Sequence, residues 1–282
     1  MNFINRDWHE TFRVATSPWR LEPDFIIAGE AKCGTTSLYR YVVEHPDVLP
    51  ADTKEPSNFI AYPGSMARCR AHYPLKGVRW WQKNVLRRDC LTGEASAEYF
   101  SRHFVARNIA RHLPDVKIII LLRDPVKRAL SDWIMLQKTG VFNDSFEDIV
   151  DRSIAWLSDR DLRPILDDAG QVEHSIMRVV LRGIYVDNLR RWKKYFDDDH
   201  LRVYPSEELF RDPDAVANDL YGYLGLDTYT LVDKEQYRKG RYDTEKYATS
   251  LRKLAAFYAP FNEELFNVLG RKLPWSVASD DF

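Results

Sequence analysis

Short apolar runs alternate with amphipathic stretches along this chain. Residues 24–28 form one apolar run between Pro23 and a glycine, and residues 116–122 (VKIIILL) form a second. Runs of this length, bounded by turn-forming residues, are typical of buried strands. Two shorter runs, at residues 91–94 and 201–204, predict further strands.

Helical patterns with capping signals follow these runs. Asp124-Pro125 and Asp212-Pro213 each place a capping carboxylate before a proline at the first helical position. The helices that we expect cover residues 35–45, 125–137, 213–224, much of 142–180, and the chain from about 244 onward, broken at Pro260. Strands that alternate with helices predict an α/β fold, here a single domain with a parallel β-sheet flanked by helices.

Composition and charge exclude several classes of protein. The 282 residues include 41 Lys+Arg and 42 Asp+Glu, so the formal net charge is −1. A general nucleic-acid binder would be clearly basic, and a disordered chain would not be 45% hydrophobic. We therefore expect a folded protein with no nucleic-acid partner.

The cysteines and the N-terminal segment bear on compartment. Cys33, Cys69 and Cys90 are scattered, form no CxxC pair and lack His partners at ligand spacing, which predicts reduced thiols and no metal site. The first 20 residues lack the apolar core of a signal peptide, and the run at 116–122 is too short to span a bilayer. We expect a cytoplasmic protein with no transmembrane segment.

A glycine-bounded turn follows the first predicted strand. It reads GEAKCGTTS over residues 29–37 and leads directly into a predicted helix. Backbone N–H groups and the helix dipole at such a turn attract an anion. The glycines have the spacing of the P-loop GxxxxGK[ST], but Thr35 stands where its lysine would, and Lys32 lies two residues before Gly34. The turn therefore predicts a phosphate site of a P-loop-like fold that does not hold a β/γ-phosphate with magnesium.

A second anion site is predicted at the end of the strand at 116–122. Magnesium-dependent P-loop enzymes usually carry an Asp at this position, whereas this chain has Arg123. Asp124 is better explained as the cap of the next helix. A guanidinium at the carboxyl end of a parallel sheet can bind phosphate oxygens bidentately, and Ser131, about two turns along the helix, can face the same crevice.

These blocks together resemble a known family. GEAKCGTTSLYRYVVEHPDV, then KEPSNF, GEASAEYF, IIILLRDPVKRALSDW, RGIYVDNLRRW and finally KGR are similar to the PAPS-dependent sulfotransferases. The resemblance is closest to the branch with the heparan-type and other carbohydrate sulfotransferases and their bacterial relatives. Matching blocks run from about Pro23 to Trp275, so we expect an N-terminal extension over residues 1–20 and a sulfotransferase domain over 21–282.

The resemblance implies a donor and the residues that hold it. The donor is PAPS, 3′-phosphoadenosine 5′-phosphosulfate, and no metal is implied. The residues that match the 5′-phosphosulfate loop are Lys32, Cys33, Gly34, Thr35, Thr36 and Ser37. Arg123 and Ser131 match the pair that binds the 3′-phosphate. A C-terminal loop that closes over the nucleotide matches Lys239, Gly240 and Arg241, with Tyr237 or Tyr242 beside it.

The chemistry of sulfuryl transfer fits these residues. The reaction is an in-line displacement assisted by positioning and electrostatics, so Lys32 can stabilise charge on the leaving phosphate. The attacking hydroxyl must lose a proton, and Glu55, which matches the family's catalytic glutamate, is the expected base. Glu94, at the end of another short predicted strand, is the rival base.

The acceptor is less well defined by the sequence. The heparan-type 3-O-sulfotransferases carry a His where this chain has Ser57, and a Lys where it has Ala95. The features tied to polyanionic sugars are therefore reduced, and a hydroxyl of a carbohydrate, a glycolipid or a small metabolite is an equally suitable acceptor.

Four further residues are candidates for acceptor contact. Trp80 and Trp81, in a stretch expected to be irregular, can stack on a sugar or pack in the core. His174 and Arg178 lie in the 142–180 segment, which often borders the acceptor cleft in the resembled family.

Two other functions stay open at this point. A P-loop nucleotide kinase or NTPase would share the fold, but the placement of Lys32 and Arg123 speaks against it. A non-catalytic nucleotide-binding protein would keep the crevice without transfer.

Overall fold

The computed structural model describes residues 3–140, 144–159, 177–234 and 244–275. Its centre is one sheet of five strands in the order β2-β3-β1-β4-β5, and every neighbouring pair is parallel. The strands are β1 (Phe25–Gly29), β2 (Val48–Pro50), β3 (Leu91–Ser96), β4 (Lys117–Leu122) and β5 (Leu201–Pro205). The α/β prediction and four of the strands are confirmed. The strand β2, which is only three residues long, was not predicted.

The central strands are apolar throughout because both faces of the sheet are covered. Every residue of β1 is buried. Ile26 and Ala28 belong to one apolar cluster, whereas Phe25 and Ile27 belong to a second cluster on the opposite face. A parallel sheet with two covered faces explains why the sequence shows continuous apolar runs here instead of alternation.

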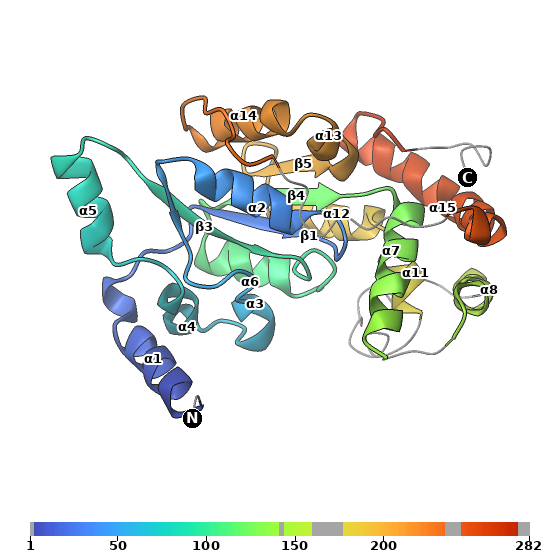
Figure 1. Cartoon of the computed structure of the whole chain (residues 1–282), viewed down its shortest axis with the longest axis horizontal. Helices are drawn as coiled ribbons and strands as arrows, with labels where there is room; N and C mark the ends of the chain where they lie inside the picture. Colours follow the sequence, from blue (N-terminus) through green and yellow to red (C-terminus); the bar gives the residue numbers. More distant parts are fainter. Residues whose placement is uncertain (1–2, 141–143, 160–176, 235–243, 276–282) are drawn as a thin grey trace.

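Helices of the two clusters cover the two faces (Figure 1). One face packs against α2 (Thr35–Glu44), α13 (Ser206–Arg211) and α14 (Pro213–Leu224). The other face packs against α6 (Val105–His112) and α12 (Val186–Lys193). The sheet is thus the middle layer of three.

A group of helices lies beyond the carboxyl ends of the strands, on the right of Figure 1. It consists of α7 (Pro125–Lys138), α8 (Phe146–Ser158), α11 (Arg178–Leu181) and α15 (Ala248–Leu269), which contact one another. A 3₁₀ turn, η2 (Glu245–Tyr247), precedes α15. The expected break at Pro260 is wrong, because α15 continues through this proline. Packing against α7, α8 and α12 outweighs the lost hydrogen bond.

Capping residues fix the helix ends that the sequence predicted. The side chain of Asp124 accepts from the backbone N–H groups of Val126 and Lys127, and Pro125 is the first residue of α7. The side chain of Asp212 caps α14, which ends at Gly225 in the left-handed conformation with a φ of 79°.

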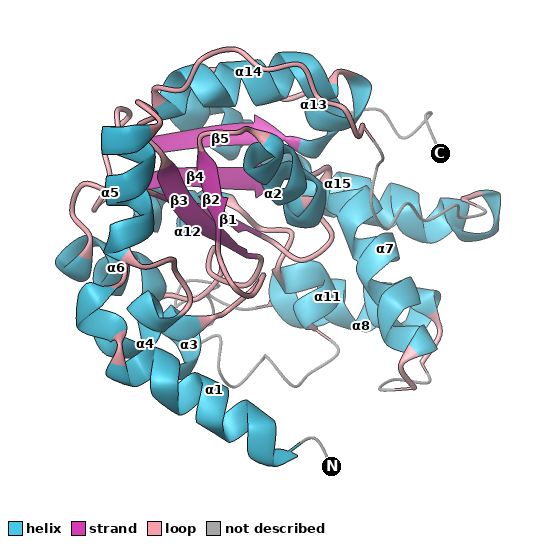
Figure 2. Cartoon of the chain, turned by 60° about the vertical axis from the view of Figure 1, so that its left-hand side comes forward, coloured by secondary structure: helices cyan, strands magenta, loops and turns pink. Residues whose placement is uncertain are grey.

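The N-terminal helix packs beside the segment that follows β2. Helix α1 (Phe3–Ala15) lies against α4 (Met66–Ala71), near α3 (Asn58–Ala61), and a 3₁₀ turn, η1 (Ser17–Trp19), follows it (Figures 1 and 2). Among the described residues, no helix combines the length and apolarity needed to cross a membrane.

Residues 76–85, which the sequence analysis expected to be irregular, form helix α5 (Lys76–Val85). Trp80 and Trp81 are exposed on it, so neither fills the core. Arg79 pairs with Asp24, immediately before β1, which attaches α5 at the amino ends of the strands. Both views place α5 on the opposite side of the molecule from α7 and α8 (Figures 1 and 2).

Candidate active site

The carboxyl ends of β1 and β3 form the part of the sheet where a ligand is expected. These strands are neighbours, with Ala28 opposite Ser96 at their ends. Helix α2 leaves β1 towards one face, and α6 leaves β3 towards the other. In open α/β sheets, ligands bind where successive connections diverge in this way.

The turn after β1 presents free backbone donors. Lys32 and Gly34 are both left-handed, with φ of 72° and 89°. Within the described part of the chain, the N–H groups of Lys32, Gly34, Thr35 and Thr36 have no hydrogen-bond partner. A Cβ at Gly34 would lie 2.6 Å from the ring of Phe210. The loop therefore has the geometry of an anion-binding nest at a helix N-terminus, and it requires glycine at this position.

The structure brings Lys32 and Arg123 together. The Lys32 ammonium lies 4.0 Å from the sulfur of Met135 on α7, one turn after Ser131. The guanidinium of Arg123, at the end of β4, donates to the carbonyl of Lys32 over 3.2 Å. Two cations thus adjoin the nest, and the buried Ser131 lies on α7 one turn before Met135.

Cys33 and Ser37, also predicted to bind the donor, are fully buried. Burial raises the pKa of the Cys33 thiol to about 12, so the thiol stays neutral. Its backbone N–H donates to the carbonyl of Glu30 over 3.1 Å. The Cys33 side chain therefore packs in the core beneath the loop and is not exposed to solvent. Ser37 lies inside the first turn of α2.

A buried ion pair holds the turn in place. The carboxylate of Glu30 accepts from the N–H of Ala31 over 3.0 Å, and Arg182 lies 3.4 Å from the same carboxylate oxygen. Burial raises the pKa of Glu30, and the nearby Arg182 opposes that rise. Arg182 also lies 3.4 Å from Glu98, which follows β3, so it joins the ends of β1 and β3.

The block that contains Arg182 also supports the residue predicted to form the second anion site, Arg123. The hydroxyl of Tyr185 donates to the backbone carbonyl of Arg123 over 3.0 Å. Sequence reasoning used the RGIY block only as a family signature and missed both contacts. Their partners lie far away in the sequence, and no local pattern indicates them.

Asp124 is a helix cap, as predicted. Its backbone N–H donates to Glu207 over 3.0 Å, and its carboxylate caps α7. Over the residues that the structure describes, no group of three or more His, Cys, Asp or Glu side chains is placed to hold a metal ion.

Glu55 lies at the carboxyl end of β3 on an exposed loop. Its N–H donates to the carbonyl of Ala95 over 3.0 Å, and the N–H of Ser57 donates to the hydroxyl of Ser96 over 3.3 Å. Its carboxylate pairs with Lys54. Glu55 and Ser57 have φ of 59° and 50°, so the backbone on both sides of the intervening proline is strained.

Glu94, the rival base, is fully buried within β3. Burial raises its pKa to about 8, and the nearby hydroxyls of Tyr99 and Tyr73 partly oppose that rise. Neither of its carboxyl oxygens has a hydrogen-bond partner within the described residues. The two glutamates therefore have opposite environments, one in water and one in the core.

Only three of the remaining candidates lie within the described residues. Trp80 and Trp81 lie on α5, at the other end of the strands. Arg178 begins α11, which contacts α7 and α8. The other candidates lie outside the described residues: His174, Tyr237, Lys239, Gly240 and Arg241.

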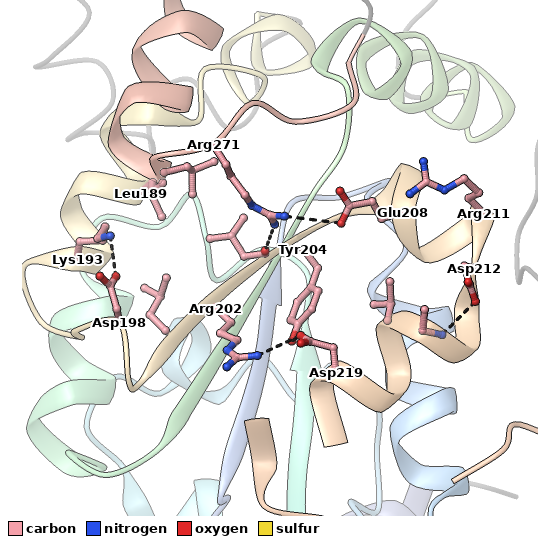
Figure 3. Close-up of a pocket in the computed structure, with 15 residues that line it drawn as sticks. Leu189, Lys193, Asp198, Arg202, Tyr204, Glu208, Arg211, Asp212, Asp219 and Arg271 are labelled. Carbon is pink, nitrogen blue, oxygen red and sulfur yellow. Dashed lines mark hydrogen bonds and ion pairs between the residues drawn. The ribbon is translucent and has the colours of Figure 1, made fainter. Parts of the chain in front are cut away.

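A separate cavity of about 610 Å³ lies along β5, between α12 and α14 (Figure 3). Most of the charged side chains that line it form ion pairs with one another. The ion pairs Lys193–Asp198, Arg202–Asp219 and Arg271–Glu208 line it. We therefore do not assign the chemistry to this cavity.

Comparison with known proteins decides the family. The family described as "Sulfotransferase domain" matches residues 22–257. This chain belongs to that family and is a sulfotransferase. Human "Heparan sulfate glucosamine 3-O-sulfotransferase 6" is 26% identical to it over 93% of this chain and 76% of the relative.

Two further relatives of this sulfotransferase agree with the assignment. The "Bifunctional heparan sulfate N-deacetylase/N-sulfotransferase 1" of Caenorhabditis elegans is 29% identical over 76% of this chain and 23% of that protein. The crystal structure of a sulfotransferase from Alicyclobacillus acidocaldarius is 27% identical, with a TM-score of 0.63, and covers 90% of this chain and 98% of that chain. The predicted family and fold are confirmed, and a kinase or NTPase is not favoured.

Proposed function

We propose that this sulfotransferase moves a sulfuryl group from PAPS to a hydroxyl of a carbohydrate, glycolipid or small-metabolite acceptor. One observation carries the proposal. The cations of Lys32 and Arg123 adjoin a loop whose N–H groups at Lys32, Gly34, Thr35 and Thr36 lack partners in the described chain. Such an arrangement suits a ligand with separate anionic groups.

The residues present fit this donor. The nest and the Lys32 ammonium would hold its 5′-phosphosulfate, while Arg123 and Ser131 would hold its 3′-phosphate. When bound, PAPS supplies an activated sulfuryl group. Gly34 lets the turn adopt its left-handed conformation against the ring of Phe210, because no Cβ stands there.

Lys32 and Glu55 would carry the chemistry. The Lys32 ammonium stabilises negative charge that builds on the leaving phosphate oxygen. Glu55 accepts the proton of the attacking hydroxyl, since its carboxylate is exposed at the strand ends. Glu94 is less suitable as a base, because a buried carboxyl with a pKa of about 8 holds its proton at neutral pH.

The relatives support a sugar as the acceptor, and the 3-O-sulfotransferase among them supports a hydroxyl of that sugar. Two of them are named for heparan sulfate, and one name specifies a glucosamine 3-hydroxyl. Ser57 and Ala95 depart from the residues that the heparan-type enzymes carry, so the acceptor need not be heparan sulfate itself.

Calorimetry tests the donor assignment without knowledge of the acceptor. We expect adenosine 3′,5′-bisphosphate to bind at least about tenfold more tightly than ATP with magnesium. Lys32→Ala and Arg123→Ala should each weaken this binding about tenfold or more, because each removes a charge-assisted contact to phosphate. Lys83→Ala, an exposed lysine of α5, is the control. Equal affinity for the two nucleotides would contradict the proposal.

A further inference from the structure

A second cavity lies beside Glu55, between the N-terminal helix and the loop that follows β2. Its volume is about 780 Å³, and it is lined by residues of α1, of α4 and of the segment 52–58. Both views place α1 and α4 side by side (Figures 1 and 2). None of the assigned donor contacts lies in it, so its role is open.

The position of the cavity connects it to the site of transfer. Thr53 and Pro56 line it, and Glu55 lies between them in the chain. The N–H of Glu55 is bonded to the carbonyl of Ala95, at the end of β3 and next to the nest after β1. Glu55 therefore stands at the boundary between this cavity and the donor crevice.

Paired charges make the walls polar without a net excess of either sign. Arg13 of α1 lies 3.4 Å from Asp52, and Arg68 of α4 lies 2.6 Å from Glu10. The guanidinium of Arg68 also covers the ring of Tyr62, at 4.0 Å from its centre. Two guanidinium groups thus face two carboxylates, and these already neutralise one another.

A histidine supplies an unsatisfied hydrogen-bonding atom. The Nδ1 atom of His72 is buried and has no partner within the described residues. Burial lowers the pKa of His72, so its imidazole is neutral at neutral pH and can donate or accept at Nδ1. Its backbone carbonyl accepts from the N–H of Asp52 over 2.8 Å, which holds the two cavity residues together.

We infer that this cavity is the acceptor site and that it takes an uncharged, hydroxyl-rich sugar unit, with His72 and Asp52 as specificity-determining residues. A sulfated or carboxylated sugar would require an excess of cations, which the paired walls do not offer. Neutral hydroxyls, in contrast, match a wall of carboxylates, guanidiniums and a neutral imidazole. This inference rests on the proposed function.

An acceptor panel with labelled PAPS tests the inference. We expect transfer to uncharged aryl glycosides and disaccharides, and at least about tenfold lower kcat/KM with an N-sulfated heparan oligosaccharide. His72→Ala and Asp52→Ala should each raise the KM for the uncharged acceptor about tenfold, since each removes a hydrogen bond, with kcat changed less than about twofold. Arg211→Ala, from the cavity along β5, is the control.

The outcomes separate the two proposals. Affinity for adenosine 3′,5′-bisphosphate is measured on every variant. The conservative variant His72→Gln, which keeps a polar side chain, checks that a higher KM in His72→Ala is not due to misfolding. If the nucleotide binds tightly, any one of three results overturns the acceptor assignment alone. These are a preference for the sulfated sugar, no transfer to any uncharged sugar, and an unchanged KM in both the His72→Ala and Asp52→Ala variants. Absence of nucleotide binding and of any transfer overturns the proposed function itself.

Discussion

Glu55 and Glu94 show that two glutamates can have different roles because their surroundings differ. Both come from conspicuous sequence blocks, and sequence reasoning could only rank them. The structure places Glu55 on an exposed loop and Glu94 in the core beside Tyr73 and Tyr99. Burial cannot be read from either block, because it depends on segments that are distant in the sequence.

Glu55→Gln should abolish most of the transfer while leaving the donor bound. The amide keeps the size of the side chain but cannot accept the proton, so we expect kcat to fall by about 10²-fold or more. Affinity for adenosine 3′,5′-bisphosphate should stay within about twofold. Turnover and calorimetry on the same preparation measure both quantities. Unchanged turnover would show that Glu55 is not the base.

Glu94→Gln should change how stability depends on pH. The folded pKa of about 8 exceeds the usual value of 4.5, so the folded state keeps a proton that the unfolded state loses between these values. The unfolding free energy contributed by Glu94 therefore falls as pH rises through this window, by roughly 5 kcal/mol. The unfolding free energy of the Glu94→Gln variant should therefore fall less with rising pH than that of the unchanged protein. Urea denaturation of both proteins at about pH 5 and about pH 8 measures this difference. An equal loss of unfolding free energy in the two proteins would contradict the prediction.

At the scale of elements, the segment from α11 to α12 supports both proposed anion sites. Arg182 holds Glu30 under the nest, and Tyr185 holds the carbonyl of Arg123. Local patterns such as caps and apolar runs predicted helices well, whereas contacts between distant elements could not be predicted. For the same reason the helical state of residues 76–85 and the continuity of α15 through Pro260 were missed.

Variants of Arg182 and Glu30 can distinguish an effect on the loop after β1 from an effect on the stability of the whole protein. Arg182→Leu removes the ion-pair partner of the buried Glu30 and should destabilise the protein by about 3 kcal/mol. The double variant with Glu30→Leu should regain most of that stability. Its affinity for adenosine 3′,5′-bisphosphate should nevertheless stay about tenfold weaker, because Ala31 has lost the carboxylate that fixes the turn. Affinity that recovers together with stability would assign Arg182 a purely structural role.

At the scale of the whole molecule, the order of the strands determines where the site lies. The sequence predicted a parallel sheet and the two loops at its carboxyl edge, because strand ends and glycine turns are local features. It did not predict that β3 lies between β2 and β1, which sets Glu55 beside the nest. The strand order is a global property of packing.

Binding of the donor product should stabilise the folded molecule. A saturating concentration, about 100 times Kd, of adenosine 3′,5′-bisphosphate contributes about 2.7 kcal/mol to the folded state. For a chain of this size that corresponds to a Tm rise of roughly 5 °C. Thermal denaturation with and without the nucleotide measures it. Lys32→Ala should show a much smaller rise, and an equal rise in that variant would remove Lys32 from the binding loop.

The two outer strands of the sheet have consequences for solubility. An edge strand with open backbone groups can pair with another chain and nucleate aggregation. Here β2 is only three residues long and ends at Pro50, and Arg271 donates to the carbonyl of Val203 on β5 over 2.8 Å (Figure 3). Arg271→Ala should therefore aggregate faster on gentle heating than Arg111→Ala, with transfer unchanged in both. Light scattering would show the difference, and equal rates would mean that β5 is protected by other means. In this view the arginine that lines the cavity along β5 keeps copies of the enzyme apart.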